Sequence, residues 1–376
     1  MSILKLADRE PIDMTRTMPP DIAGLNLRIR ASLANVANLD DLDFMVQRHR
    51  FFGSESEKEL AADWLGKRLG FTPSADRLYI SGGTQNCLQI LMPRLVGTGN
   101  CLATEMMSYA GISQICRLFD IRVAGVEIDE YGLVPDAFAR VCERERPKVL
   151  YCNPTIHNPT TSILSVSRRS EIAEIARRNG VIIIEDDVHG KLMPNAPPPI
   201  ASIAPDITWY LMSVSKCIGM GLRVAFLVSP EDEAAFLDLC TPIQSISSWF
   251  VPGISSAIVA DLIKSGAADE IATEIQKEVA ARQAIASGAL KGFSFLSKNA
   301  SLHLWLSLPD HWKVSDLVSA VRRDNVLMRA SDLFNAGGIT MPNKVRLSLV
   351  APKTRAELSF ALERIVENLN RYPPAV

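Results

Sequence analysis

The sequence predicts an α/β protein, with a mostly parallel, doubly wound sheet and a smaller α+β domain. Between residues 77 and 230, seven short apolar runs alternate with segments of helical character, the order typical of β-α-β units. The runs are rich in Val, Ile and Leu and lack polar alternation, as expected for strands covered by helices on both faces. The chain also has 376 residues, more than one hydrophobic core usually contains, which favours two domains.

The predicted elements follow one another in a regular order. The expected strands of the large sheet are 77–81, 101–106, 122–128, 148–154, 181–187, 208–216 and 223–229. From about 230 to 290 the pattern becomes helical, in EDEAAFLDLC, ISSAIVADLIKSG and EIATEIQKEVAARQAIASGAL. The remainder alternates strand and helix, in SLHLWLSLP, KVSDLVSAVRRDNVLM, NKVRLSLV and TRAELSFALERIVENL. We therefore expect a large domain at 46–280 and a small domain formed by 1–45 plus 281–376.

The composition argues against several classes of function. A formal net charge of −2, with the charges interspersed, provides no basic surface for nucleic acid or an anionic membrane. The start, MSILKLADREPID, lacks the pattern of a secretory signal, and no apolar run approaches the ~20 residues of a membrane span. The seven cysteines form no C-x-x-C pair and lie mostly in apolar runs, as reduced core residues do. We expect a cytoplasmic protein that acts on small molecules and has no metal site.

Polar and reactive side chains follow several of the predicted strands. In open parallel sheets, ligands bind outside the carboxyl ends of the strands, so residues at these positions are candidates for a site. Reading each strand to its end gives Gly83, Thr84, Gln85, Tyr109, Asn158, Asp186 and Lys216. These side chains are expected to converge on one edge of the sheet.

The chemistry of these candidates points to one kind of ligand. Asp186 follows a run of apolar residues, where a carboxylate is costly to bury unless it meets a cation or a firm donor. Lys216 is preceded by Ser213 and Ser215 and followed by Arg223, which suits a phosphate next to an amine. Each residue alone has an ordinary structural explanation, since a lysine at a strand end is usually solvated. Pyridoxal phosphate would satisfy all of these groups together, because it carries an aldehyde, a pyridine nitrogen and a phosphate.

The motifs that hold these residues resemble those of fold-type I aminotransferases of class I/II. The resemblance extends over nearly the whole chain and is greatest to the aminotransferase-like domain of MocR-type regulators in the GntR family. It is carried by IDMTRTMPP, ISGGTQNCLQIL, the E-x-x-x-Y-x-G pattern at 105–111, VEIDEYGL, HNPTT, IIIEDDVHGKL, SVSKCIGMGLR, SLHLWLSLP and NKVRLSLV. The lysine segment, with Gly-Leu-Arg ending seven residues later, is the most specific of these motifs.

The resemblance implies a role for each matching residue. Lys216 would hold the cofactor as a Schiff base and then move the proton, while Asp186 would keep the pyridine nitrogen protonated. Asn158 would bond the ring 3-hydroxyl oxygen, Tyr109 would stack on the ring, and Arg346 would bind the substrate α-carboxylate. The phosphate would be held around Gly83 by Thr84, Gln85, Ser213, Ser215 and Arg223.

Several positions depart from the family pattern. His189 replaces a usual tyrosine three residues after the cofactor aspartate, and its charge is expected to change near neutral pH. Arg48, in QRHRFFG, stands near the place of a tyrosine that commonly reaches the partner subunit's phosphate. Thr161 replaces a glycine after N-P-T, and Cys217 replaces a common threonine as a packing change. His157 could touch substrate or serve as a hydrogen-bonded loop residue.

Three functions remain open from the sequence. The first is transamination between an α-amino acid and a 2-oxo acid, by a homodimer that shares its active sites. The second is an effector module, as in MocR-type regulators, although residues 1–45 lack the length and pattern of a winged-helix DNA-binding domain. The third is another pyridoxal-phosphate reaction, such as elimination or decarboxylation. Substrate choice is expected to involve Arg16 and the loops near Trp249 and Arg329.

Overall fold

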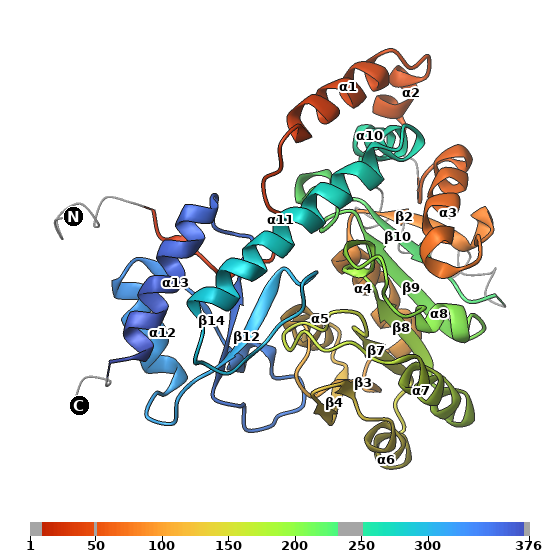
Figure 1. Cartoon of the computed structure of the whole chain (residues 1–376). Helices are drawn as coiled ribbons and strands as arrows, with labels where there is room; N and C mark the ends of the chain where they lie inside the picture. The colour runs from red at the N-terminus through yellow and green to blue at the C-terminus, as the bar shows by residue number, and fades with distance from the viewer. Residues whose placement is uncertain (1–9, 49–50, 232–250, 372–376) are drawn as a thin grey trace.

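A computed structural model describes residues 10–48, 51–231 and 251–371 of the chain. It confirms the predicted α/β architecture (Figure 1). The large sheet has the strand order β2-β10-β9-β8-β7-β3-β4, in which β10 is antiparallel to both of its neighbours and the other pairs are parallel. Its strands are β2 (Leu78–Ser81), β3 (Cys101–Glu105), β4 (Arg122–Val126), β7 (Val149–Cys152), β8 (Ile182–Asp186), β9 (Thr208–Ser213) and β10 (Ala225–Val228).

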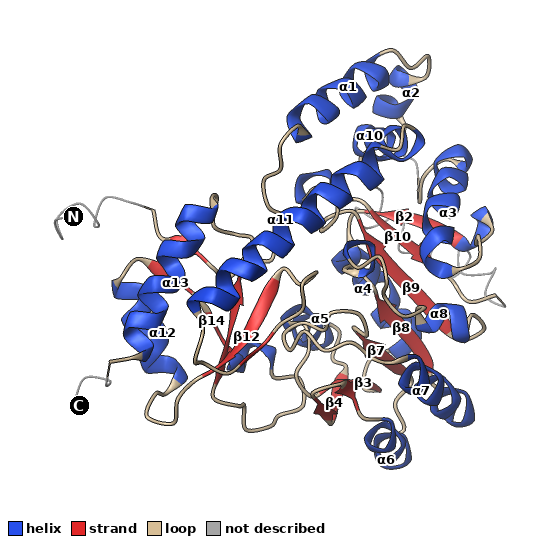
Figure 2. Ribbon diagram, viewed as in Figure 1, coloured by secondary structure: helices blue, strands red, loops and turns tan. Residues whose placement is uncertain are grey.

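Helices cover both faces of this sheet, as its continuous apolar strands require (Figure 2). Successive residues of a strand point to opposite faces, so Tyr151 and Ile184 pack with α4 and α5, whereas Leu150 and Ile183 pack with α6 and α7. The helices of this domain include α3 (Glu55–Leu69), α4 (Thr84–Leu91), α5 (Ala110–Leu118), α6 (Pro135–Glu145), α7 (Val166–Asn179), α8 (Ile200–Ile203) and α10 (Gly253–Lys264). A short hairpin is formed by β5 (Ile128–Asp129) and β6 (Gly132–Leu133).

A smaller sheet forms the second domain. Its strand order is β11-β12-β15-β14, with all pairs antiparallel, and the short β1 and β13 pair beside it in parallel. The strands are β1 (Ile12–Asp13), β11 (Phe295–Leu296), β12 (His303–Ser307), β13 (Val326–Leu327), β14 (Arg329–Ala330) and β15 (Lys344–Ser348). The helices α12 (Val314–Arg323) and α13 (Arg355–Leu369) pack on these strands around a separate apolar core.

One long helix connects the two domains. α11 (Ala267–Ala289) buries Ile271 and Ile275 in the core of the large domain, whereas Ala286 near its end lies in the core of the small domain. Backbone hydrogen bonds from Ser108 to Phe334 and from Ala336 to Met106 join the domains a second time. The two cores are therefore held in a defined relative position, with α11 running between them (Figure 1).

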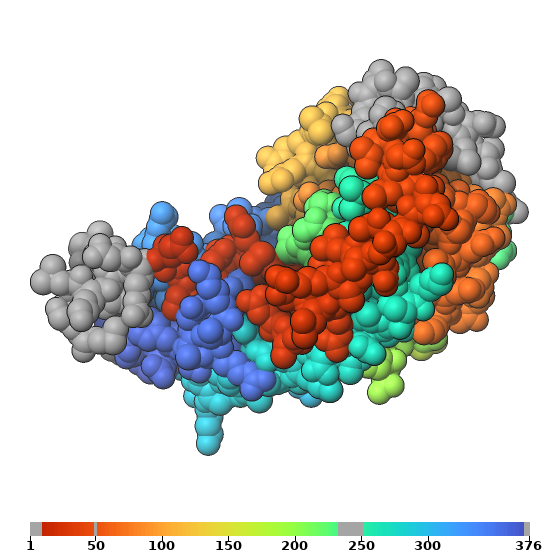
Figure 3. Space-filling model, turned by 90° about the horizontal axis from the view of Figure 1, so that it is seen from above, coloured from red at the N-terminus to blue at the C-terminus, as the bar shows by residue number. Residues whose placement is uncertain are grey.

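The N-terminal segment differs from its expected place. β1 pairs with β13 of the small domain, but α1 (Leu25–Ala37) and α2 (Leu42–Gln47) pack against α10 of the large domain. The segment thus crosses one face of the molecule from the small domain to the large one (Figure 3). Residues 25–45, which were expected in the small domain, therefore pack on the large one, and the boundaries of the two domains stay a prediction. Of the expected helix EDEAAFLDLC, residues 232–240 lie outside the described ranges.

Candidate active site

Most of the candidate residues line one pocket at the carboxyl ends of the parallel strands. The pocket is partly open to solvent, and its space, open solvent included, is about 770 Å³. It is lined by Thr17, Thr84, Gln85, Tyr109, Tyr151, Asn153, Asn158, Asp186, Val188, His189, Ser213, Ser215, Lys216, Met220 and Arg223. The candidates selected by the rule that ligands bind at the carboxyl edge of a parallel sheet therefore lie together in the fold.

The Lys216 amine and the Asp186 carboxylate face the same pocket. Asp186 is the last residue of β8, and Lys216 lies in the turn that follows β9. Burial raises the pKa of Asp186 to about 6, against the hydrogen bond from Tyr151 and the positive charge of Lys216. Burial also lowers the pKa of Lys216 to about 8, assisted by the charge of Arg346. Near neutral pH both groups are therefore close to a change of protonation state.

One oxygen of Asp186 is left without a partner. The Tyr151 hydroxyl donates to Oδ2 at 2.7 Å, and the Val188 backbone N–H also favours the charged carboxylate, whereas the buried Oδ1 has no partner with full hydrogen-bond geometry among the described residues. Asn153 donates to the Asp186 carbonyl oxygen and accepts a hydrogen bond from the Asn158 backbone at 3.1 Å. A buried acceptor of this kind needs a donor from a ligand, and a protonated pyridine nitrogen would provide one.

The turn before α4 forms a cradle beside Arg223. Gly83 has a φ of +115°, and a Cβ at this position would lie 2.6 Å from Nη2 of Arg223, so a side chain would collide with the guanidinium. Arg223 donates to the Gly82 carbonyl at 3.0 Å. The backbone N–H groups of Thr84 and Gln85 belong to the first turn of the helix, where partial positive charge favours an anion.

Two serines face this cradle from the turn after β9. The Ser213 hydroxyl bonds the Ser215 hydroxyl at 2.8 Å and lies 3.1 Å from the Val224 carbonyl oxygen. Both serines line the pocket beside Thr84 and Arg223. A guanidinium, hydroxyls and a helix N-terminus together form a donor set that suits a phosphate group.

Arg346 adjoins the pocket through Asn158. Its Nη1 donates to Asn158 Oδ1 at 2.7 Å, and its guanidinium stacks over the Phe334 ring at 4.9 Å. Burial, assisted by the positive charge of the nearby Arg329, lowers the pKa of Arg346 to about 9. The guanidinium is thus fixed in orientation by a hydrogen bond and an aromatic face, as a carboxylate clamp requires.

The structure also decides two questions about histidines. His189 lines the pocket, with its ring 6.3 Å from that of His303, and burial lowers its pKa to about 3. It is therefore neutral near pH 7, contrary to the expectation that its charge changes there. His157 is buried outside the pocket lining and bonds Thr160 at 2.7 Å, as a loop residue would.

Two arginines named from the sequence do not reach this pocket within the chain. Arg48 is exposed at the end of α2 and does not line the pocket. Arg16 points outward, with its side chain 69% exposed and 3.7 Å from Asp13. Trp249 lies outside the described residues.

Sequence reasoning missed several residues that line the pocket. Tyr151 lies in β7 and Asn153 directly follows this strand, after which the sequence prediction named only Asn158. Taking every polar residue near the end of the strand as a candidate would have included both. Thr17 contributes its backbone carbonyl, which accepts a hydrogen bond from Lys216 and leaves no signal in the sequence.

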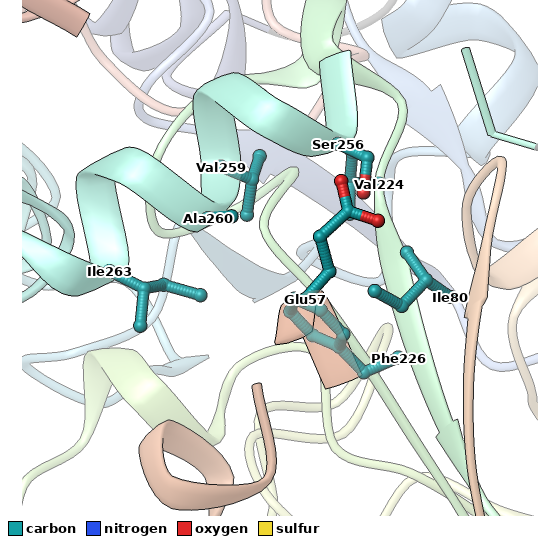
Figure 4. A pocket seen from close by; sticks show the side chains of 8 residues that line it. All are labelled: Glu57, Ile80, Val224, Phe226, Ser256, Val259, Ala260 and Ile263. Carbon is teal, nitrogen blue, oxygen red and sulfur yellow. The ribbon is translucent and has the colours of Figure 1, made fainter. Parts of the chain in front are cut away.

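A second cavity in the large domain contains none of these residues. It lies between α3, α10 and the edge of the sheet, and Figure 4 shows the Glu57 carboxylate beside Ser256 among mainly apolar side chains. The cavity has about 180 Å³ and is lined by Glu57, Ile80, Val224, Phe226, Ser256, Val259, Ala260 and Ile263. It is too small and too apolar for the predicted chemistry.

Other features of the described residues concern metals, membranes and cysteines. Residues 10–48, 51–231 and 251–371 contain no group of His, Cys, Asp and Glu side chains arranged to hold a metal ion. In the same ranges no helix has the length and apolar character needed to cross a bilayer. The six described cysteines are free and buried, as predicted for core residues.

The residues present fit pyridoxal phosphate. The pocket places an amine, an unsatisfied buried carboxylate oxygen, an aromatic ring and an anion cradle around one space. Tyr109, whose hydroxyl accepts a hydrogen bond from Gln85 at 2.5 Å, supplies the aromatic face. The four groups match the aldehyde, the pyridine nitrogen, the flat ring and the phosphate of that cofactor.

Known proteins with similar sequences include regulators and transaminases. The chain is 25% identical over 340 residues to an HTH-type transcriptional regulator of Bacillus subtilis, YdeF, covering 90% of this chain and 73% of the regulator. For two further regulators of that organism, YisV and YdfD, the match spans 61% and 56% of their own length. The 2-aminoadipate transaminase of Thermus thermophilus is also 25% identical, over 77% of this chain and 73% of the transaminase.

Similar solved structures share the fold. The α-aminoadipate aminotransferase LysN of Thermus thermophilus, solved with N-(5'-phosphopyridoxyl)-L-leucine, superposes with a TM-score of 0.85 at 22% identity, covering 98% of this chain and 94% of LysN. The kynurenine aminotransferase of Pyrococcus horikoshii gives the same TM-score at 19% identity, over 98% and 93% of the two chains. The family model described as aminotransferase class I and II matches residues 47–365. The chain therefore belongs to the class I and II aminotransferases, a family of fold-type I enzymes that depend on pyridoxal phosphate.

Proposed function

We propose that this protein transfers an amino group between an α-amino acid and a 2-oxo acid, with pyridoxal phosphate as its cofactor. The observation that supports this most is that Lys216 and Asp186 line one pocket, and that the buried Asp186 Oδ1 has no hydrogen-bond partner among the described residues. The Arg346–Asn158 pair adjoins the same pocket and could hold a substrate carboxylate beside the amine. An amine, an anchor for the ring and a carboxylate clamp are the minimum set for this chemistry.

Lys216 has two tasks in this proposal. Pyridoxal phosphate supplies an aldehyde that condenses with a primary amine and a conjugated ring that withdraws electrons from the substrate α-carbon. Lys216 would hold the cofactor through its aldehyde, and its neutral amine would move the proton to and from the substrate α-carbon. Its lowered pKa, about 8, leaves a useful fraction of neutral amine for both tasks near neutral pH.

Asp186 and Tyr151 hold the opposite end of the ring. Asp186 Oδ1 would accept a hydrogen bond from the protonated pyridine nitrogen. The Tyr151 hydroxyl donates to Oδ2 at 2.7 Å and so fixes the plane of the carboxylate. A carboxylate next to a pyridinium is stabilised in its charged form, which offsets the cost of burying it. Asn158 and the neutral His189 would lie near the ring hydroxyl oxygen.

Arg346 binds the α-carboxylate and orients the substrate. Asn158 occupies Nη1, while Nη2 bonds the Thr15 backbone carbonyl at 2.5 Å and the buried Nε has no hydrogen-bond partner among the described residues. Nε and Nη2 form one edge of the guanidinium, which can donate two parallel bonds to a carboxylate once Thr15 moves aside. This contact places the substrate amine and α-carbon beside Lys216.

A second candidate function is a sensor that binds an amino acid through the cofactor without turning it over. The first relatives reported above are transcriptional regulators, which favours this alternative. A third is a lyase reaction, since the cofactor supports several bond cleavages in one fold. The complete clamp and the titratable lysine favour transamination.

The test follows the visible absorption band of lysine-bound pyridoxal phosphate. Purified protein should show this band, and Lys216→Ala should lack it. An α-amino acid should remove the band from the holoenzyme, and a 2-oxo acid should restore it. A band that no amino acid removes would favour the sensor, and release of ammonia without any acceptor would favour a lyase. A wild-type protein that never binds the cofactor would contradict the whole assignment.

We further propose a homodimer with shared active sites. Apolar side chains stand exposed along the N-terminal helices, including Leu27, Phe44 and Val46, which are 73%, 51% and 67% exposed. A second subunit could cover this surface and receive Arg48 at its phosphate. Sedimentation should give a dimer, and a fully active monomer would contradict it.

The buried, free cysteines also support the proposed cytoplasmic location.

A further inference from the structure

Two arginines stand directly opposite each other on neighbouring strands of the small domain. Arg329 of β14 pairs with Arg346 of β15 in an antiparallel register. Directly opposed residues of an antiparallel pair project from the same face of the sheet, so both side chains leave toward the same side. Like charges in this position destabilise the fold, because they repel each other at close range. Such a pair calls for an anion that is absent from the protein itself.

No protein carboxylate compensates the two charges. In the described part of the chain, neither guanidinium forms an ion pair with Asp or Glu, although many surface arginines do. Instead, both donate to one backbone oxygen: Arg329 Nε lies 3.0 Å and Arg346 Nη2 lies 2.5 Å from the carbonyl oxygen of Thr15. A carbonyl carries only a partial charge, so it satisfies hydrogen bonds without neutralising two cations.

Arg329 also lies beside the pocket. Arg329 and Arg346 both donate to the Thr15 carbonyl oxygen, and Arg346 also donates to Asn158, which lines the pocket. Arg223 belongs to the phosphate cradle, so Arg329 marks a second positive region near the substrate end, next to the α-carboxylate clamp.

We propose that Arg329 binds the side-chain carboxylate of a dicarboxylic substrate, so that the enzyme acts on acidic amino acids and on the corresponding 2-oxo diacids. This inference rests on the proposed function, in which Arg346 holds the α-carboxylate. Two adjacent guanidinium groups match two carboxylates that a short aliphatic chain separates. The Thr15 carbonyl occupies a position between the two guanidinium groups, and it withdraws when the diacid enters.

Two simpler roles for Arg329 give different results. It could only anchor the N-terminal segment through Thr15, or it could share the α-carboxylate with Arg346. In either case its loss weakens binding of every amino acid by the same factor, with or without a second carboxylate. The proposed role predicts a loss that is confined to diacids.

Binding of unreactive acids tests the proposal independently of turnover. Glutarate and pentanoate have the same chain length but two carboxylates and one, and neither carries an amine. The wild-type holoenzyme should bind glutarate at least about tenfold more tightly than pentanoate, as measured by calorimetry, because a second charge-assisted pair forms. Arg329→Gln should remove this difference, whereas Arg346→Gln should weaken both ligands. Arg16→Gln removes an exposed arginine that lies next to Thr15 in the N-terminal segment, and it should preserve the difference between glutarate and pentanoate.

The amino-transfer half-reaction provides the second readout. Glutamate should remove the visible band more efficiently than glutamine in the wild type, and Arg329→Gln should lower the rate constant for glutamate by about tenfold or more while that for glutamine changes little. Equal losses for both donors, or a wild type without preference for glutarate, would overturn the proposal. If no amino acid removes the band but glutarate still binds through Arg329, the transaminase function fails and the diacid site stands.

Discussion

Replacing Asp186 should change cofactor affinity and the stability of the cofactor-free protein in opposite directions. The replacement Asp186→Asn should stabilise the protein without cofactor and weaken its affinity for pyridoxal phosphate. The carboxylate is buried with Oδ1 unsatisfied, so its charge is a cost in the empty protein. A pKa of about 6, instead of 3.8, corresponds to about 3 kcal/mol, since each pKa unit is about 1.4 kcal/mol.

The dependence on pH follows from the same shift. Between pH 3.8 and about 6, the folded protein binds more protons at Asp186 than the unfolded chain does, so its stability falls as the pH rises. Above about pH 6 the full cost is present. Urea unfolding of the cofactor-free protein should therefore show Asp186→Asn more stable at pH 7.5 by up to about 3 kcal/mol. The difference should shrink toward pH 4.

The neighbouring Asp187 is a matched control. It is equally buried but accepts hydrogen bonds from Arg68 Nε at 2.9 Å and from the Tyr210 hydroxyl at 3.0 Å. Asp187→Asn leaves a mostly buried guanidinium without its counter-charge, and it should destabilise the protein by about 3 kcal/mol or more. If Asp186→Asn destabilised the empty protein as well, or left its pH dependence unchanged, the argument from an unsatisfied carboxylate would be refuted.

Three further predictions concern the same pocket. The rate of cofactor capture should rise with pH through the Lys216 pKa of about 8, because only the neutral amine attacks the aldehyde; stopped-flow absorbance would show this, and a flat profile up to pH 9 would contradict it. Arg346→Ala should raise KM for amino acids in steady-state kinetics, by a ratio that corresponds to about 1.5–3 kcal/mol or more of lost binding free energy, because a charge-assisted pair is lost. An unchanged KM would mean that the clamp lies elsewhere. Tyr151→Phe should weaken cofactor affinity by about 1 kcal/mol, since Asp186 loses its 2.7 Å donor, and an equilibrium titration would measure the change.

The sequence predicted the large sheet well because its strands are buried on both faces. Such strands form continuous apolar runs, and these were visible between residues 77 and 230. The strand-end rule then led to Asp186 and Lys216 without any knowledge of side-chain direction. Both predictions succeed because apolar runs and strand ends can be read from residues that are neighbours in the sequence.

The rest of the site depends on contacts that act over long sequence separations. The Thr17 carbonyl bonds Lys216, and the Thr15 carbonyl bonds Arg346, but a backbone oxygen is the same in every residue. The direction of Arg329 depends on its register against β15, which pattern alone does not fix. α1 packs against α10 of the large domain, a tertiary contact that the sequence of α1 does not reveal by itself.

The pairing of the Thr15 carbonyl with Arg346 has a consequence for how the protein acquires its activity during synthesis. The two residues are separated by 331 positions, so the ribosome completes almost the entire polypeptide before they meet. A nascent chain released before β15 would possess the phosphate cradle and Lys216 yet lack any means of orienting an amino acid. Ordering of the substrate end should thus be among the latest events of folding.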